Sequence, residues 1–364
     1  MGINTIFQRA GANSTQTSVQ TMNVYNGITK ERAIEICQEQ FALLATDVIQ
    51  EAKEIAQERV NQFSSKLLPK LASYDEQFRA LAEPSYLVAL RKAQLSSICT
   101  DKEADYELLS ELMLERAQVQ DDRRRQVGIA KALEIVGQVS DEALLGLSVI
   151  YIATRLMPIC NDLHQALQMY DQEFAKLIGN RSLPEGSDWI DELDVLTAVR
   201  IGHLGVKSSQ VYFSETFSAH LVGGVEDGSE ECERIKKDMQ EVGLPVEVML
   251  VPHPLKPNYL KLATNAEVDD ILLTYEIDGK CDTEELTSEQ RDVLQSVAKE
   301  LRKDESKQKD MQKAFILEWN KYPTLKMIGE WWDKLAYAPM LTPVGLALGN
   351  AYVRTIDPFI PKLY

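Results

Sequence analysis

Residues 29–48 read Thr-Lys-Glu-Arg-Ala-Ile-Glu-Ile-Cys-Gln-Glu-Gln-Phe-Ala-Leu-Leu-Ala-Thr-Asp-Val and open a long amphipathic pattern. Apolar side chains recur every three or four residues from Ile34 through Phe41 and Val48 to Leu67, with Glu, Lys and Arg between them. A helix of about 40 residues, rising ~1.5 Å per residue, would be roughly 60 Å long. One small core does not cover that length, so we expect part of the helix to pack against another helix or another subunit.

A polar leader precedes this helix. Residues 13–26 read Asn-Ser-Thr-Gln-Thr-Ser-Val-Gln-Thr-Met-Asn-Val-Tyr-Asn and carry no charge. β-Branched and amide side chains favour an extended strand, yet neither side of it has enough apolar surface to dock on a core. Such a strand pairs most readily with copies of itself. We therefore expect the leader and the first helix to build a homo-oligomer. The expected interface residues there are Gln16, Val19, Gln20, Met22, Val24, Tyr25, Ile34 and Phe41.

Helix signals continue along the chain. Helix starts are marked by Pro84, Asp121–Asp122, Ser140 and Asn161–Asp162, so residues 28–180 are predicted to be close to all-α. Further helices are expected over 188–204, 288–302, 310–320 and 324–337, and strands over 244–251 and 271–277.

The predicted fold class is mainly α, a helical bundle with a long N-terminal helix and a short polar N-terminal β-strand. A small α/β region and a winged-helix-like C-terminal module complete it. The expected segments are a leader over 1–27, a helical domain over 28–185, the mixed region over 186–285 and the C-terminal module over 286–364.

The composition is that of a soluble globular protein, with 45% hydrophobic and 26% charged residues. There are 39 basic and 56 acidic side chains, for a net charge of −17, which argues against a nucleic-acid partner. Five widely spaced cysteines favour reduced thiols in a cytosol. Neither a signal peptide nor an apolar run long enough to span a bilayer is found, so a cytoplasmic protein without a membrane partner is expected.

Three segments carry a family resemblance. They are Glu-Leu-Leu-Ser-Glu-Leu-Met-Leu-Glu-Arg-Ala from Glu107, Gly-Ile-Ala-Lys-Ala-Leu-Glu-Ile-Val from Gly128, and Val-Ser-Asp-Glu-Ala-Leu-Leu-Gly-Leu-Ser from Val139. With the polar leader, they resemble a family of uncharacterised bacterial proteins that place an Asn/Gln/Thr-rich, β-like leader before an α-helical body. Those proteins look like parts of the accessory and defence gene pool. The resemblance covers roughly residues 12–200 and implies a context, but no catalytic residue.

A second resemblance lies near the C-terminus. The run Leu-Thr-Pro-Val-Gly-Leu-Ala-Leu from Leu341 is similar to the step that follows the wing in winged-helix domains, and three expected helices precede it. The helix in the recognition position carries no net charge but holds Trp331 and Trp332. This composition fits a protein-binding module better than a DNA-binding one. Such tryptophans are mostly core residues; otherwise they anchor an interface with another protein.

Two patterns allow a metal. His203, His220, Cys232 and His253 could supply a zinc site, but no two of them have the usual ligand spacing, so packing or surface histidines are the simpler interpretation. Asp270, Asp278 and Lys280 are similar to the acid and Asp-x-Lys set of a metal-dependent nuclease. Asp278–Gly279 after an apolar run is, however, an ordinary turn. No cofactor is expected.

One basic triplet, Arg123–Arg125, follows two aspartates. Local ion pairs on a helix face are the default interpretation, and an anion-binding patch is the sharper one. Taken together, the sequence favours a non-enzymatic oligomeric sensor or scaffold of a bacterial, anti-phage defence pathway, whose C-terminal module binds another protein. The first alternative is a metal-dependent nuclease or other effector enzyme with a site around residues 220–282. The second is a DNA-binding regulator.

Overall fold

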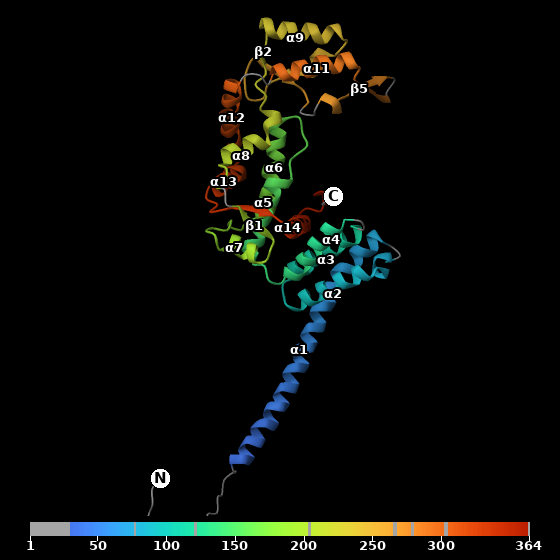
Figure 1. The fold of residues 1–364 in the computed structure, drawn as a ribbon, viewed down its shortest axis with the longest axis vertical. Helices are drawn as coiled ribbons and strands as arrows, with labels where there is room; N and C mark the ends of the chain where they lie inside the picture. The colour runs from blue at the N-terminus through green and yellow to red at the C-terminus, as the bar shows by residue number, and fades with distance from the viewer. Residues whose placement is uncertain are drawn as a thin grey trace, which may run out of the picture. The chain divides into compact units, whose positions relative to one another are not determined.

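The computed structural model describes residues 30–75, 78–119, 122–202, 205–264, 268–277, 280–301 and 305–362. These residues are mainly helical, as the sequence predicted, with a few short strands (Figure 1). The chain divides into two compact units, Met1–Glu58 and Arg59–Tyr364. The polar leader lies outside the described residues.

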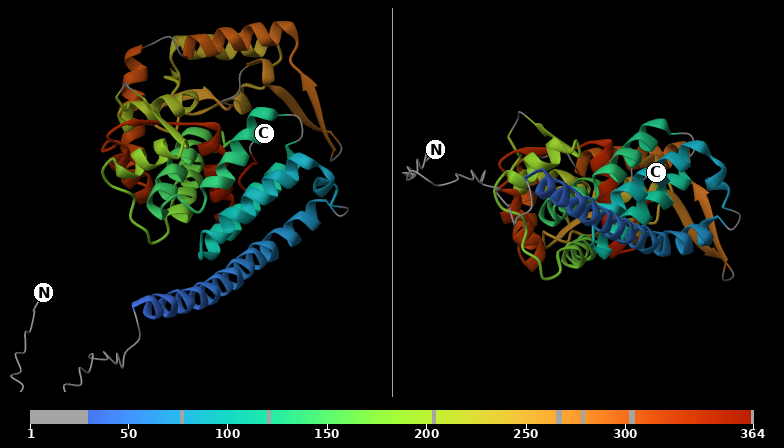
Figure 2. Two further views of the ribbon diagram at one scale, coloured as in Figure 1. Left: turned by 60° about the horizontal axis from the view of Figure 1, so that its bottom comes forward. Right: turned by 90° about the horizontal axis from the view of Figure 1, so that it is seen from below.

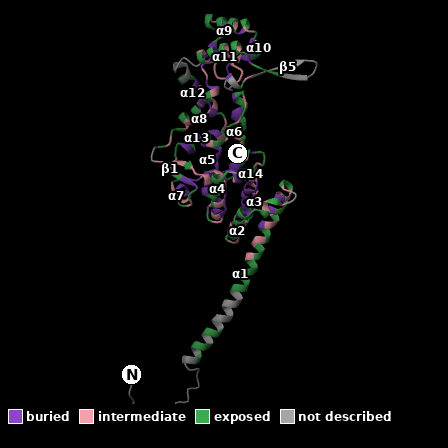
Figure 3. Ribbon diagram, turned by 45° about the vertical axis from the view of Figure 1, so that its right-hand side comes forward, coloured by how far each residue is buried: buried purple, intermediate pink, exposed green. Residues whose placement is uncertain are grey.

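The long first helix is confirmed as α1, which runs over Lys30–Tyr74. Near its C-terminal end Phe63, Leu67 and Leu71 are buried, and this end carries the purple residues of the helix in Figure 3. These positions are three or four residues apart, the spacing that puts side chains on one face of a helix. Side chains on the other faces of α1 are exposed, and Leu68 is one of them.

The next helices are α2 (Pro84–Ile98), α3 (Glu103–Gln118), α4 (Arg123–Ile135), α5 (Asp141–Arg155) and α6 (Leu163–Ile178), with the short 3-10 helix η1 (Arg79–Ala82) before them. Their starts agree with the sequence signals. The side chains of Asp122, Ser140 and Asp162 each accept a hydrogen bond from the backbone N–H three residues further on, at 3.0, 3.1 and 2.7 Å. These bonds satisfy N–H groups that have no partner inside the helix.

The helix expected over 188–204 is too long. Helix α7 covers only Asp188–Val195, and strand β1 follows over Val199–Gly202. Thr197 adopts a left-handed backbone conformation with φ of 61°, which ends the helix. The strand then pairs antiparallel with β7 (Ala338–Leu341), so that Val199 lies opposite Leu341. A distant partner segment therefore overrides the local helical pattern.

A small mixed region follows. It contains α8 (Ser209–Thr216), η2 (Ser218–His220), β2 (Val225–Glu226), α9 (Glu230–Glu241), α10 (Val246–Met249), β3 (Leu250–Pro252), β4 (Tyr259–Leu262), η3 (Val268–Asp270), β5 (Leu272–Ile277) and β6 (Lys280–Glu285). Strands β2, β4 and β3 form one antiparallel sheet in that order, and β5 pairs with β6. The strand expected over 271–277 is thus confirmed. Half of the one expected over 244–251 is helical, because Pro245 O accepts from the N–H groups of Val248 and Met249 at 3.1 and 3.0 Å; only its end belongs to a strand, β3.

The C-terminal helices are α11 (Ser288–Leu301), α12 (Glu305–Trp319), α13 (Pro323–Trp332) and α14 (Pro343–Ile356). Their buried residues do not share one core. Those of α11 pack with α9 and β3, and those of α12, α13 and α14 pack with α3, α5 and α6. Strand β7 pairs with the distant β1 and not with a strand of a neighbouring hairpin. The structure therefore does not show a winged-helix core.

Two hydrophobic clusters organise the unit that begins at Arg59. The first draws buried residues from 63–221 and again from 311–360, and the second draws them from 225–301. Helices α9 and α11 of the second cluster run side by side (Figure 2). The segment boundary expected between residues 285 and 286 falls inside the second cluster, because this cluster includes residues on both sides of it, from Val225 to Val268 and from Leu286 to Leu301. In the described part of the chain, no helix combines the length and apolar character needed to cross a membrane.

Candidate functional site

The described zinc candidates, His220, Cys232 and His253, do not form a metal-ligand group. His203 lies outside the described residues. His220 is buried in η2, and burial lowers its pKa to about 4. His253 is buried too: its Nδ1 accepts from the Leu255 N–H at 3.1 Å, so Nε2 carries the proton that is donated to Val222 O at 2.8 Å. Both described histidines are thus neutral packing residues.

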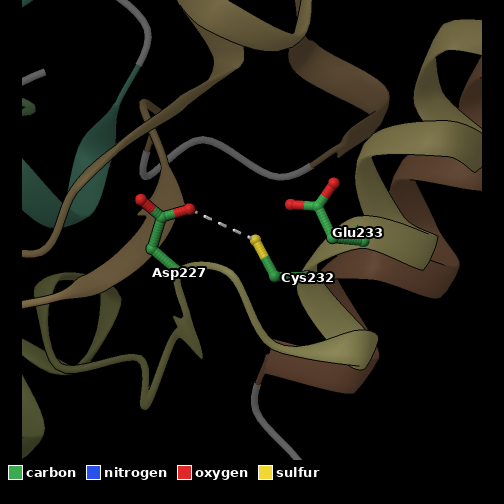
Figure 4. Close-up of side chains that lie close together, drawn as sticks. All are labelled: Asp227, Cys232 and Glu233. Carbon is green, nitrogen blue, oxygen red and sulfur yellow. Dashed lines mark hydrogen bonds between the residues drawn. The ribbon is translucent and has the colours of Figure 1, made fainter.

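Cys232 lies instead beside two carboxylates (Figure 4). Its Sγ is 3.8 Å from Asp227 Oδ1, and Glu233 is the third member of this group. The Lys236 ammonium lies 2.9 Å from Asp227 Oδ1 and 3.0 Å from Glu233 Oε1. These contacts lower the pKa of Asp227, with the hydrogen bond from Lys236 as the largest cause. The Lys236 ammonium therefore already neutralises the two carboxylates that a metal cation would bind.

The nuclease residues lie around the β5–β6 hairpin. Asp270 is exposed at the end of η3, and Lys280 begins β6 opposite Ile277. Asp278 and the side chain of Lys280 lie outside the described part of the structure. The interpretation of these residues as catalytic stays a prediction.

The tryptophans expected at an interface are core residues. Trp331 stacks on Trp189 with ring centroids 5.8 Å apart, and its Nε1 donates to Pro184 O at 2.8 Å. Trp332 stacks on Tyr212 at 4.5 Å and donates to Lys207 O at 2.9 Å. Because both indoles are buried and hydrogen-bonded within their own chain, neither presents a surface to a partner in this structure.

The other expected interface residues lie on α1 and in the polar leader. Ile34 is 47% exposed on α1, as an interface residue needs to be. The side chain of Phe41 and all of the leader residues, Gln16, Val19, Gln20, Met22, Val24 and Tyr25, lie outside the described part of the structure.

The arginine triplet separates into two kinds of side chain. Arg125 lies 3.7 Å from Glu115 of α3, an ion pair between two helices and not the local pair on one helix face that the sequence indicated. Arg123 and Arg124 are exposed and form neither an ion pair nor a hydrogen bond with the described residues. They line an open groove of about 730 Å³ together with a third such arginine, Arg200 of β1. We call this feature the arginine groove.

The floor of the arginine groove is apolar. Val199, Gly128 and Val344 are buried there, and Val127 is exposed at its edge. The close approach of α4 to Pro343 requires glycine at position 128, because a Cβ there would lie 2.7 Å from Pro343 O. Among the described lining residues of the groove, Asp194 is the only carboxylate. Three cations against one anion make this a positive site on an acidic protein, with room for an extended segment.

Hydrogen bonds fix the backbone of the groove. The Thr342 hydroxyl lies 2.7 Å from Thr197 O and 3.0 Å from Ala198 O, and it accepts from the N–H groups of Val344 and Gly345. Thr197, in its left-handed conformation, and the start of α14 are thereby held together. The groove is a rigid surface, able to bind an acidic chain by charge and by apolar contact.

Sequence reasoning found only part of this site. The triplet signalled a basic patch, but Arg200 and the Thr342–Val344 segment lie far along the chain. Nothing in the local pattern around Arg200 connects it to Arg123. In the structure β1 pairs with β7, which leads into α14, and α14 packs against α4, the helix of Arg123.

Comparison with known proteins adds one match. A protein-family model whose description reads “:-like” matches residues 27–360, a span that begins where the polar leader ends. No curated protein and no solved structure matches the chain.

Proposed function

We propose that this chain, which belongs to the family whose model spans residues 27–360, is a non-enzymatic scaffold or sensor that assembles with copies of itself. The observation that supports this most is the apolar stripe of α1. Ile34 and Ile49 are 47% and 55% exposed. At 3.6 residues a turn, Ile34 and Ile49 belong to the same stripe as Phe63 and Leu67, which are buried in a core.

A second copy of the chain is the occupant that we propose for this stripe. Isolated helices are marginally stable in water and gain most of their stability from a covered apolar face. The same stripe on another copy supplies such a face. The polar leader supports self-assembly too, because an uncharged strand that cannot dock on a core pairs with identical strands.

The assembly is tested by the mass of the full chain in light scattering. We expect a multimer, and we expect Ile34→Asp combined with Ile49→Asp to lower the mass. Removal of residues 1–27 should lower it as well. Leu68→Asp is the matched control, because Leu68 is 49% exposed on α1 but lies off the stripe. A monomeric wild type, or a multimer that survives both changes, contradicts the proposal.

The arginine groove is the proposed binding surface for a protein partner of this scaffold. It uses Thr342, Pro343 and Val344 of the C-terminal segment, where the sequence placed partner binding. An acidic peptide segment with apolar residues suits it better than a nucleic acid. The floor is apolar, there are few cations, and the chain carries a net charge of −17.

Fluorescence anisotropy with an acidic amphipathic peptide tests this surface. Arg123→Glu with Arg124→Glu should abolish binding, and Arg91→Glu, an exposed arginine outside the groove, should not. A control peptide with Gln in place of Glu should bind weakly. Stronger retention of single-stranded DNA than of the peptide would favour a nucleic-acid partner instead. The proposed setting, a bacterial defence pathway, rests on the resemblance of the leader and helical body alone.

A further inference from the structure

A second cavity, of about 600 Å³, lies where the end of α1, η1 and α2 meet the C-terminal end of α3. Its most unusual lining residue is Arg116, which is 6% exposed. The guanidinium donates to Val119 O at 3.1 Å and to Ser85 Oγ at 2.7 Å. It forms no ion pair with any described carboxylate. Among the described residues its charge complement is the electrostatic attraction of Glu83, so its remaining N–H groups can still serve an anionic acceptor.

Tyr86 gives a second, independent observation in the same cavity, which we call the Arg116 pocket. The residue is 1% exposed, and its hydroxyl has no hydrogen-bond partner among the described residues. Burial raises the pKa of this phenol to about 12, so the group is a neutral donor at neutral pH. Buried hydroxyls are nearly always hydrogen-bonded. Two buried donors thus line one cavity: Arg116, which has N–H groups left over from its two hydrogen bonds, and Tyr86, which has no acceptor among the described residues.

The charges of the described lining residues indicate what else the ligand carries. Arg79 and Arg116 contribute two positive charges, and Asp75 and Glu83 contribute two negative ones. Asp75 accepts from the Ala80 N–H at 3.0 Å, and Glu83 accepts from the Ser85 hydroxyl at 3.2 Å, but neither forms an ion pair with a described residue. A dianion such as phosphate would face both carboxylates. A ligand with one anionic and one cationic end would complement both signs.

We propose that the Arg116 pocket binds a small zwitterion of the amino-acid class. The carboxylate accepts hydrogen bonds from Arg116 and Tyr86, which leaves neither donor without a partner. The ammonium group faces Asp75 and Glu83. The volume is that of a small-molecule site and leaves room for a side chain. This site is separate from the α1 positions Ile34 and Ile49 and from the arginine groove, so its failure would leave the assembly proposal untouched.

The test is calorimetric titration of the full chain with free amino acids at millimolar concentration. The comparison probes are acetate for the acid alone, ethylamine for the amine alone, and inorganic phosphate. We expect at least one amino acid to bind more tightly than all three. Tyr86→Phe should weaken that binding by about tenfold, the loss of one hydrogen bond to a charged group. Arg116→Lys, which keeps the charge but loses the planar fork, should also weaken it.

Tyr106→Phe is the matched control. Tyr106 is equally buried and lies on α3, but it does not line the pocket, and its hydroxyl donates to Thr100 O at 3.0 Å. Tyr86→Phe removes a hydroxyl without a partner, so it should fold and report on binding alone. No binding by any amino acid, tighter binding of phosphate, or amino-acid binding that Tyr86→Phe leaves unchanged would each overturn the proposal.

Discussion

Glu192 completes the N-cap of a helix to which it does not belong. Its two carboxylate oxygens accept from the backbone N–H of Ser140 at 2.6 Å and from the Ser140 hydroxyl at 2.8 Å, while Ser140 Oγ accepts from the Ala143 N–H. In the usual capping box, a Glu or Gln at the third helical position makes the first of these bonds. Alanine stands there in α5, and Glu192 of α7 takes the role.

Glu192→Ala should therefore destabilise the protein. It removes two hydrogen bonds to a charged group. Among the described residues, these bonds are the side-chain link between α7 and the start of α5. We expect a loss of about 1–2 kcal/mol in the free energy of unfolding, measured by urea denaturation. Glu185→Ala, in the exposed linker, is the control and should change the free energy little. Equal effects of the two variants would show that the cap contributes nothing.

The two buried tyrosines give a second prediction. Tyr86→Phe should leave stability unchanged or raise it, because the hydroxyl that it removes has no described partner. Tyr106→Phe should cost about 1 kcal/mol, because it breaks the bond to Thr100 O. The measurement is thermal and urea unfolding of ligand-free protein. A large loss for Tyr86→Phe would show that its hydroxyl already has a partner within the chain.

Two buried groups should give the pH dependence of stability opposite slopes. Burial raises the pKa of Glu115 to about 7 from 4.5, so the folded state holds its proton more tightly than the unfolded state. Stability from this group is present below pH 4.5 and is lost as the pH rises toward 7. The loss amounts to about 3 kcal/mol at most. Glu115→Gln should flatten this part of the profile and stabilise the protein above pH 7.

His220 acts in the reverse sense. Burial lowers its pKa from 6.5 to about 4, so the unfolded state takes up a proton that the folded state refuses. Stability is present above pH 6.5 and is lost as the pH falls toward 4. The free energy of unfolding of wild type, Glu115→Gln and His220→Gln, measured across this pH range, separates the contribution of Glu115 from that of His220. The proton-linked mechanism fails if both variants keep the wild-type slope.

Two buried helical glycines should respond oppositely to alanine. A Cβ on Gly345 would overlap the carbonyl oxygen of Ala198, so Gly345→Ala should destabilise by about 1–3 kcal/mol. On Gly329 the nearest heavy atom to a Cβ is 3.5 Å away, which is ordinary contact. Gly329→Ala should therefore stabilise α13 by about 0.5–1 kcal/mol. Differential scanning calorimetry of both variants is the check, and shifts of the same sign would contradict it.

The sequence predicted the helices well because their signals are local. Pro84, Asp122, Ser140 and Asp162 mark starts that the structure places within a residue or two. Local patterns failed where distant segments decide the outcome. The run after Val195 has a helical pattern, yet residues 199–202 form β1 because β7 offers its backbone for pairing. The core role of Trp331 was the simpler expectation, but its stacking on Trp189 needed the fold to be seen.

The candidate sites were harder to predict for the same reason. The basic triplet pointed to Arg123 and Arg124 but gave no hint of Arg200. Arg116 looks like an ordinary helix residue in sequence, since its distinguishing property is burial without an ion pair to any described carboxylate. A count of arginines and glutamates cannot reveal which of them remain unpaired.

The division of the first core has a consequence for synthesis. The buried residues of that core come from 63–221 and then from 311–360, and α14 packs against α3, α4 and α5. A ribosome must therefore release nearly the whole chain before these helices can be covered. Until then the emerging polypeptide exposes the apolar surfaces of α3, α4 and α5, which makes it a substrate for holding chaperones. A stop codon before residue 343 would leave that surface permanently open, so even a short C-terminal truncation should direct the protein to degradation.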